Sequence, residues 1–153
     1  MNPQQEAWIK SFKHPEKRKW LFGYSKTKIV DLMLDFLRKN KIRVHRVIDV
    51  GCGSGRNTIA LAKIGFEVYG IDFIKDALDT LKKRAKREGL SIVTIYHDIT
   101  KAPWPIEKDF FDAAIINVVL DSIERNKRKI VAKELHRILR KNGYLFIYEP
   151  SIN

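Results

Sequence analysis

Apolar positions along this chain follow two periods, and each change of period predicts a change of secondary structure. In the second predicted helix they recur every three or four positions, and the residues expected to face inward are Ile29, Leu32, Met33, Phe36 and Leu37. Helical spacing predicts helices over residues 5–13, 25–39, 56–64, 74–88 and 124–140. Short runs rich in β-branched and aromatic residues predict strands over 44–50, 66–71, 91–96, 110–116 and 144–148.

Caps and turn residues predict where these elements begin and end. Ser25 is the predicted N-cap of the second helix, with Thr27 as the alternative, because their side-chain oxygens accept hydrogen bonds from the first helical amides. Asn142–Gly143 is expected to end the last helix. Pro103 and Pro105 indicate a loop between the third and fourth strands.

The predicted strands are apolar along most of their length and alternate with helices or long crossovers. That order calls for a parallel sheet with both faces covered. Right-handed crossovers leave few ways to arrange such strands. Ligands of these sheets bind beyond the carboxyl ends of the strands, where the strand order reverses. The residues that follow each strand are therefore the first candidates for a binding site.

A glycine-rich segment, V-I-D-V-G-C-G-S-G over 47–55, connects the first predicted strand to the helix 56–64. Glycines accept positive φ angles and let a ligand approach the backbone closely. Their spacing fits neither the dinucleotide-binding fingerprint nor the P-loop. Asp49 precedes the turn, and its carboxylate suits a cationic group and would repel a pyrophosphate. The implied ligand is an amino acid or nucleoside that carries positive charge.

Acidic residues also follow the second and third predicted strands. Asp72 lies about 20 residues past the glycine turn, where a carboxylate accepts hydrogen bonds from ribose hydroxyls. Its alternative role is to cap the next helix. Phe73 would lie against a purine face or in the core. Asp98 and the backbone amide of Ile99 are placed to bind the edge of an adenine.

Together these motifs resemble those of the class I S-adenosylmethionine (SAM)-dependent methyltransferases. V-I-D-V-G-C-G-S-G resembles the first motif of that family, Y-G-I-D-F the second and H-D-I the third. F-D-A-A-I-I-N-V-V-L-D-S-I resembles the fourth-strand motif, and L-H-R-I-L-R-K-N-G-Y-L-F-I the helix, turn and strand after it. The resemblance covers roughly residues 44–149. It implies an α/β fold, a three-layer Rossmann-like sandwich whose mainly parallel five-stranded sheet has the order 3-2-1-4-5.

The resemblance also implies which residues bind SAM. They are Asp49, Gly51, Cys52, Gly53, Gly55, Asp72, Phe73, Asp98, Ile99 and Asn117. The glycine turn would line the methionine part, with Asp49 near its ammonium group. Asp72 would bind both ribose hydroxyls, and Phe73 with Asp98–Ile99 would contact adenine. Asn117 would lie near the sulfonium, through its backbone carbonyl.

Two further expectations follow from the family pattern. Such enzymes often close a lid over the cofactor, and Trp20, Tyr24 and Lys26 are placed to do so. The family sheet usually has seven strands and ends in an antiparallel hairpin, whereas this sequence ends after the fifth predicted strand. Residues 144–148 would then form an exposed apolar edge. We expect that edge to pair with a second copy of the chain in a homodimer.

Methyl transfer from SAM is an in-line displacement that depends on holding acceptor and methyl group close and aligned, so a general base is optional. His97, Asp121 and Tyr24 are the candidates, and each also has a structural interpretation. The D/N-P-P-F/Y motif of enzymes that methylate amino groups of DNA bases is absent, since N-V-V-L occupies 117–120. Cys52 lies in the cofactor turn, which disfavours methylation of cytosine carbon 5 through a cysteine nucleophile.

The charge distribution bears on the methyl acceptor. The net charge is +12, and residues 1–46 hold 12 Lys/Arg against four Asp/Glu. Such a field attracts nucleic acids, although a solvated surface gives the same pattern. Aromatic residues among these lysines would stack on bases or pack on the sheet, and they are Trp8, Phe12, Trp20, Phe22 and Tyr24. The expected acceptor is a nucleic acid or a protein.

Two other functions stay open. One is a small-molecule methyltransferase, because L-D-S-I after the fourth strand resembles a segment that many of those enzymes carry. The other is a non-catalytic SAM-binding module that needs a partner subunit. An NAD-binding domain is disfavoured by the glycine spacing.

The length of 153 residues predicts one domain, with a helical cap over 1–43 and a Rossmann-like core over 44–153. The single cysteine excludes an internal disulfide and offers no metal-cluster spacing, so no metal is expected. No apolar run approaches the ~20 residues of a membrane span. The first residues lack the apolar stretch of a signal peptide, so we expect a cytoplasmic protein.

Overall fold

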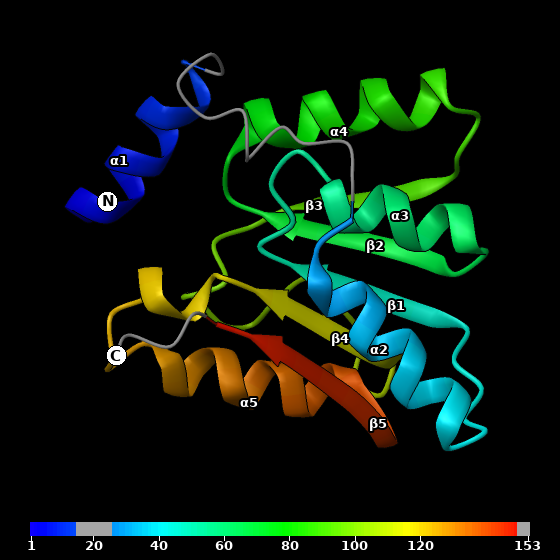
Figure 1. The fold of residues 1–153 in the computed structure, drawn as a ribbon. Coiled ribbons are helices and arrows are strands. Elements are labelled where there is room, and N and C mark those ends of the chain that lie inside the picture. Colours follow the sequence, from blue (N-terminus) through cyan, green and yellow to red (C-terminus); the bar gives the residue numbers. More distant parts are fainter. Residues whose placement is uncertain (15–25, 150–153) are drawn as a thin grey trace.

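A computed structural model describes residues 1–14 and 26–149 of the chain. Its centre is a five-stranded sheet in the order β3-β2-β1-β4-β5, in which every neighbouring pair is parallel (Figure 1). The strands are β1 Arg46–Val50, β2 Glu67–Asp72, β3 Ile92–Tyr96, β4 Phe111–Asn117 and β5 Leu139–Tyr148. The expected strand order and parallel arrangement are therefore confirmed.

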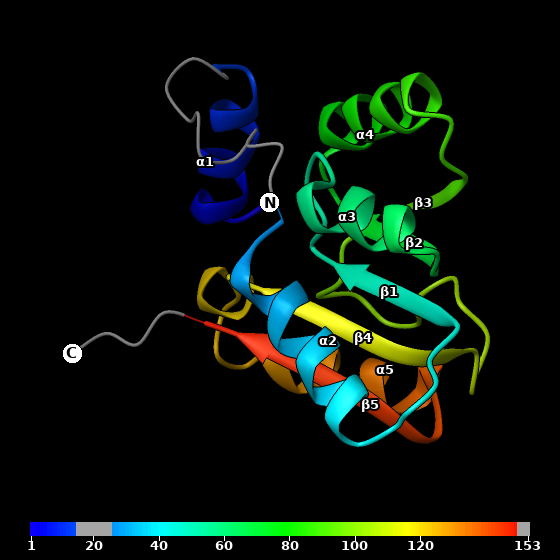
Figure 2. The same cartoon turned by 45° about the vertical axis from the view of Figure 1, so that its right-hand side comes forward.

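Helices cover both faces of this sheet (Figure 2). One face packs against α2 Lys28–Lys39, α3 Arg56–Ile64 and α4 Lys75–Arg87, and the other against α5 Arg128–Ile138 and the loop that contains Trp104. Alternate residues of β1 supply the two cores, Val47 to the α2 side and Ile48 to the α5 side. Among the described residues, no helix is long and apolar enough to cross a membrane.

The end of α5 differs from the prediction. The helix stops at Ile138 and β5 starts at Leu139, so Asn142–Gly143 lies inside the strand and does not end the helix. Leu139 already pairs with Phe111, whereas Ala113 pairs with Tyr144, and the four residues between them bulge out of the ladder. Asn142 takes up the irregular backbone with φ of +64°. Pairing with β4 thus overrides the helical pattern of the sequence.

Helix α2 also turns a different face to the core than its spacing suggested. Ile29, Val30, Met33 and Leu37 are buried, whereas Leu32 and Phe36 are 47% and 41% exposed. The Phe36 ring lies beside those of Tyr144 and Phe146 on β5, the edge strand of the described sheet. Among the described residues, no strand lies beyond β5 on this side of the sheet. Thr27 is the observed N-cap position, and Ser25 lies outside the described residues.

Candidate cofactor-binding site

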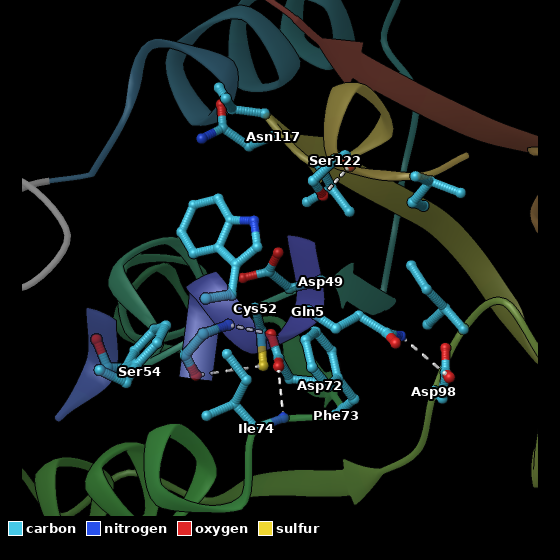
Figure 3. Close-up of a pocket in the computed structure, with 18 of the residues that line it drawn as sticks. Gln5, Asp49, Cys52, Ser54, Asp72, Phe73, Ile74, Asp98, Asn117 and Ser122 are labelled. Atoms are coloured by element: carbon cyan, nitrogen blue, oxygen red, sulfur yellow. Dashed lines mark hydrogen bonds between the residues drawn. The ribbon is translucent and has the colours of Figure 1, made fainter. Parts of the chain in front are cut away.

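A cleft of about 320 Å³ opens at the carboxyl ends of the strands, toward which the arrowheads in Figure 1 point. Nine of the ten residues predicted to bind the cofactor line it: Asp49, Gly51, Cys52, Gly53, Asp72, Phe73, Asp98, Ile99 and Asn117. Figure 3 shows Asn117 and Ser122 on one side of the cleft, Asp72 and Asp98 on the other, and Asp49 between them. The parallel sheet causes this convergence, because it brings the turns after β1, β2, β3 and β4 to one edge.

The turn after β1 requires glycine at its first position. The amides of Gly51 and Cys52 donate to the carbonyl of Ile71, at 2.9 and 3.2 Å, and so tie the turn to β2. Gly51 has φ of +71°, and an added Cβ would lie 2.5 Å from Cγ2 of Val119. Any larger residue would therefore strain the backbone and collide with the segment after β4.

Gly55 is the one predicted cofactor residue that does not line the cleft. It occupies the N-cap position of α3 with φ of +87°, and an added Cβ would lie 2.1 Å from Cδ1 of Leu81 on α4. The third glycine of the motif thus allows α3 and α4 to pack closely. Gly55 therefore has a structural role next to the site.

Asp72 connects the glycine turn to the end of β2. Its side chain is 7% exposed, and its two oxygens accept from the amides of Gly53 and Ile74, at 2.8 and 2.9 Å. Burial raises the pKa of Asp72, while the backbone hydrogen bonds oppose that rise. Asp72 does not occupy the N-cap position of α4, which is Ile74. Each carboxylate oxygen has a second lone pair, so the side chain has acceptor capacity left for a ligand hydroxyl.

Asp49 lies deeper, at 3% exposure. The hydroxyl of Thr58 donates to its Oδ2 at 2.7 Å. Burial raises the pKa of Asp49 to about 7, and the charge of Asp72 adds to the rise, while the Thr58 hydrogen bond opposes it. Near neutral pH this group therefore exchanges a proton, and a cation placed beside it would favour its ionised form.

The loop after β3 holds the third acidic residue. Asp98 accepts from the amide and hydroxyl of Thr100, at 3.0 and 2.7 Å, and from the Gln5 side-chain amide at 3.2 Å. Ile99 is buried, and its carbonyl accepts from the indole N–H of Trp104 at 3.0 Å. These contacts fix the loop against the core and leave Asp98 with one oxygen facing helix α1.

The end of β4 is tied to the start of α2. The Thr27 amide and hydroxyl both lie 2.9 Å from Oδ1 of Asn57 and donate to it. The same hydroxyl lies 3.3 Å from Oδ1 of Asn117, at the last position of β4. Asn117 therefore shares a polar contact with residues far from it in sequence, at the side of the cleft opposite Asp72.

Helix α1, Pro3–Phe12, contributes residues that the sequence analysis did not assign to the site. Asn2, Gln5, Trp8 and Phe12 line the cleft. The helix is anchored by the Gln5 contact with Asp98 and by the side-chain amide of Asn2, which donates to Oε1 of Glu124 at 3.0 Å. Asn2 and Gln5 also form a capping box at the start of the helix. This capping pattern, together with Trp8 and Phe12 four positions apart, is the sequence signal that could have pointed to α1 as part of the site.

Helix α1 thus covers the cleft, whereas the sequence predicted a lid formed by residues further along the chain. Trp20, Phe22 and Tyr24 lie outside the described residues. Lys26 is half-exposed, pairs with Asp31 and does not line the cleft. Lys26 is therefore not part of this cover.

The candidates for a chemical role are held in structural contacts. Burial raises the pKa of the Cys52 thiol well above its usual value, which keeps it protonated and disfavours a nucleophilic role. His97 lines the cleft, and its Nε2 lies 2.8 Å from the carbonyl of Lys101. Asp121 is exposed and does not line the cleft, and Tyr24 lies outside the described residues.

Comparisons with known proteins agree with this geometry. A family model described as a methyltransferase domain matches residues 48–147. The chain belongs to this family. It has the fold of class I SAM-dependent methyltransferases, and SAM is the cofactor of that family.

The relatives act on different acceptors. The chain is 26% identical to a tRNA N(3)-cytidine methyltransferase from Gallus gallus over 67% of the chain and 30% of that protein. It is 29% identical to a ubiquinone biosynthesis O-methyltransferase from Actinobacillus pleuropneumoniae over 75% of the chain and 50% of that protein. A SAM-dependent methyltransferase structure from Methanosarcina mazei superposes with a TM-score of 0.65 at 25% identity, over 72% of the chain and 55% of that protein. The chain thus spans about a third to a half of these curated relatives.

The raised pKa of Asp49 gives a test that needs no ligand. The folded protein keeps the Asp49 proton up to about pH 7, whereas the unfolded chain loses it near the ordinary value of 3.8. Between these values the wild-type protein loses stability as pH rises, and Asp49→Asn removes that loss. The free energy of unfolding of the variant, relative to wild type, should rise by on the order of 2 kcal/mol between about pH 5 and pH 8. Denaturant titrations measure it, and parallel pH curves for the two proteins would contradict the environment described for Asp49.

Proposed function

We propose that this methyltransferase domain binds SAM in the cleft and transfers its methyl group to an acceptor that enters the same cleft. The observation that carries the proposal is the buried carboxylate of Asp72, bonded to the Gly53 amide and with acceptor capacity left. Asp49 lies beneath the same turn and suits a cationic ligand. Gly51, Cys52 and Gly53 would line the methionine part, and Phe73, Asp98 and Ile99 the adenine. Asn117 would lie near the sulfonium.

When bound, SAM supplies an electrophilic methyl group on a sulfonium, and transfer is an in-line displacement that removes positive charge. The chain's own part is to hold the two reactants and exclude water. Asp49 would hold the ammonium end of the cofactor and Asp72 its ribose, and helix α1 would cover it with Trp8 and Phe12. Alignment of this kind is worth up to ~7–11 kcal/mol without a general base. We therefore assign no base.

We further propose a nucleic acid as the acceptor, long enough for one nucleotide to enter the cleft while its backbone contacts a basic groove elsewhere on the domain. A groove at the opposite end of the sheet from the cleft carries five basic side chains: Arg38, Lys41, Arg43, His45 and Arg140. The one acid among the residues that line this groove, Asp112, accepts from two backbone amides and pairs with Arg140, so it balances the charge of that arginine but not those of Lys41 and Arg43. The tRNA-modifying relative supports this acceptor class, whereas the ubiquinone-pathway relative supports the small-molecule alternative.

The arrangement of the chain supports two further proposals. Residues 1–43 would form a helical cap on a core of residues 44–153, since α1 and α2 pack on the cleft and the sheet. The exposed side chains of Leu145 and Ile147 on β5 support a homodimer through that edge. The cytoplasmic location expected from the sequence stays a prediction.

Calorimetry tests the cofactor proposal. Wild type should bind SAM with a micromolar dissociation constant and should not bind NAD, because the glycine turn and Asp49 favour a cation over a pyrophosphate. Asp72→Ala should abolish SAM binding, whereas Asp76→Ala, an exposed carboxylate on the first turn of α4, should leave it unchanged. Binding of NAD in preference to SAM, or equal SAM binding by the Asp72 and Asp76 variants, would refute the proposal. SAM binding without turnover on any acceptor pool would favour the non-catalytic module.

Fluorescence anisotropy with a labelled tRNA tests the acceptor proposal. Affinity should fall steeply as salt rises, because phosphate contacts release counterions. The double variant Lys41→Gln/Arg43→Gln should lower the slope of log affinity against log salt by about 1.5 to 2. Its matched control is Lys83→Gln/Lys86→Gln on α4, away from the groove. A salt-independent affinity, or the same loss in both double variants, would contradict nucleic-acid binding in this groove.

Sedimentation velocity tests the homodimer. The wild-type chain should sediment as a dimer at micromolar concentration, and Ile147→Lys on the β5 edge should give a monomer. A monomeric wild type would refute pairing through this edge.

A further inference from the structure

A strained turn forms one wall of the cleft. Val118 has φ of +56°, a left-handed conformation that β-branched residues rarely adopt. It lines the cleft directly after β4, and its amide donates to the carbonyl of Tyr148 at 2.8 Å. Strained backbone of this kind persists only where its surroundings hold it, and it concentrates at functional sites.

Glu149 holds the next two residues of this turn. Its Oε1 accepts from the amides of Val119 and Leu120, both at 2.8 Å. Because Glu149 directly follows β5, this carboxylate ties the end of β5 to the turn after β4. Its Oε2 is buried and has no hydrogen-bond partner among the residues that the structure describes. An unpaired buried oxygen costs free energy, so the contact is not optimised for stability alone.

The turn that Glu149 holds covers the glycine turn. Cγ2 of Val119 lies 2.5 Å from the point where a Cβ on Gly51 would be, so the Val119 side chain packs directly over Gly51. Val118 and Val119 both line the cleft, whereas Glu149 does not. A shift of residues 118–120 would therefore change the width of the cleft beside the glycine turn, although the same residues would still line the cleft.

We propose that Glu149 is a positioning residue for the cofactor. Its carboxylate holds the strained turn 118–120 so that Val118 and Val119 form the wall beside Gly51, and in this way it sets the width of the cleft at the glycine turn. Glu149 acts through these two valines and has no contact with the cofactor of its own. This inference rests on the proposed function, because the cleft is taken to be the SAM site.

The chain offers a matched control for this contact. Oδ2 of Asp112 also accepts from two consecutive backbone amides, those of His45 and Arg46, at 2.7 and 2.9 Å. Asp112 lies at the other end of β4 from the cleft. Loss of either carboxylate frees two backbone amides, but only loss of Glu149 should alter the cleft.

Calorimetry with SAM on folded variants tests the inference. Glu149→Ala should bind SAM about tenfold more weakly than wild type, and Asp112→Ala should bind it as wild type does. Glu149→Gln should keep wild-type affinity, because its amide oxygen accepts from the same two amides without a charge. Glu149→Asp keeps the charge but is one methylene shorter, so it should also weaken binding. If Glu149→Ala does not fold, Glu149→Asp takes its place in the test.

Each outcome decides the inference. Wild-type affinity in Glu149→Ala, or in Glu149→Asp if only the latter folds, would overturn it, as would a Glu149→Gln variant as weak as Glu149→Ala. Equal losses of SAM affinity in the Asp112 and Glu149 variants would show a general effect of stability and would overturn the inference as well. If wild type itself does not bind SAM, the proposed function fails. In that case the role of Glu149 in holding residues 118–120 is tested by amide hydrogen exchange at Val119 and Leu120, which Glu149→Ala should accelerate.

Discussion

The hydrogen bond from the Gly53 amide to the Asp72 carboxylate is the contact on which the site depends. It joins the turn after β1 to the end of β2. It also satisfies part of the hydrogen-bonding capacity of a carboxylate that is buried, whereas most carboxylates in proteins are exposed to water. Asp49, beneath the same turn, has its pKa raised to about 7 by burial. The domain therefore places two acidic groups against bare backbone, an arrangement that costs stability and that a bound cationic nucleoside would offset.

Parallel strand order explains why these groups meet. Residues 49, 72, 98 and 117 lie far apart in sequence, yet each lies at or just beyond the carboxyl end of a strand, and the sheet order β3-β2-β1-β4 brings those ends together. The polar contacts of Thr27 and Gln5 then connect the two N-terminal helices to this edge. Helix α1 covers the cleft from outside, so access to the site depends on that helix as well as on the turns.

The strands and the glycine turn could be predicted because short-range signals determine them. Apolar β-branched runs indicated the five strands, and the glycine turn with the acid before it and the acid after the next strand indicated Asp49 and Asp72. Gly55 matched the motif for another reason, since its missing side chain makes room for Leu81. Leu32 and Phe36 followed the helical period and are nevertheless exposed, because burial depends on which elements pack against a helix face and not on its period alone.

Other features could not be predicted because they depend on contacts between distant segments. Nothing in the local sequence at Val118 indicates a left-handed backbone, since the Tyr148 carbonyl accepts from its amide and the Glu149 carboxylate accepts from those of the next two residues. The early start of β5 likewise depends on pairing of Leu139 with Phe111. Helix α1 was predicted as a helix, but its place over the cleft depends on contacts with distant residues, among them those of Gln5 with Asp98 and of Asn2 with Glu124.

A crystal structure with S-adenosylhomocysteine, the product left after methyl transfer, tests the central claim most directly. In that structure we expect ribose hydroxyls within hydrogen-bond distance of Asp72, adenine between Phe73 and the Asp98 loop, and the amino acid part along residues 51–53. Density for the ligand at another edge of the sheet, or a cleft in which Asp72 contacts no ribose, would contradict it.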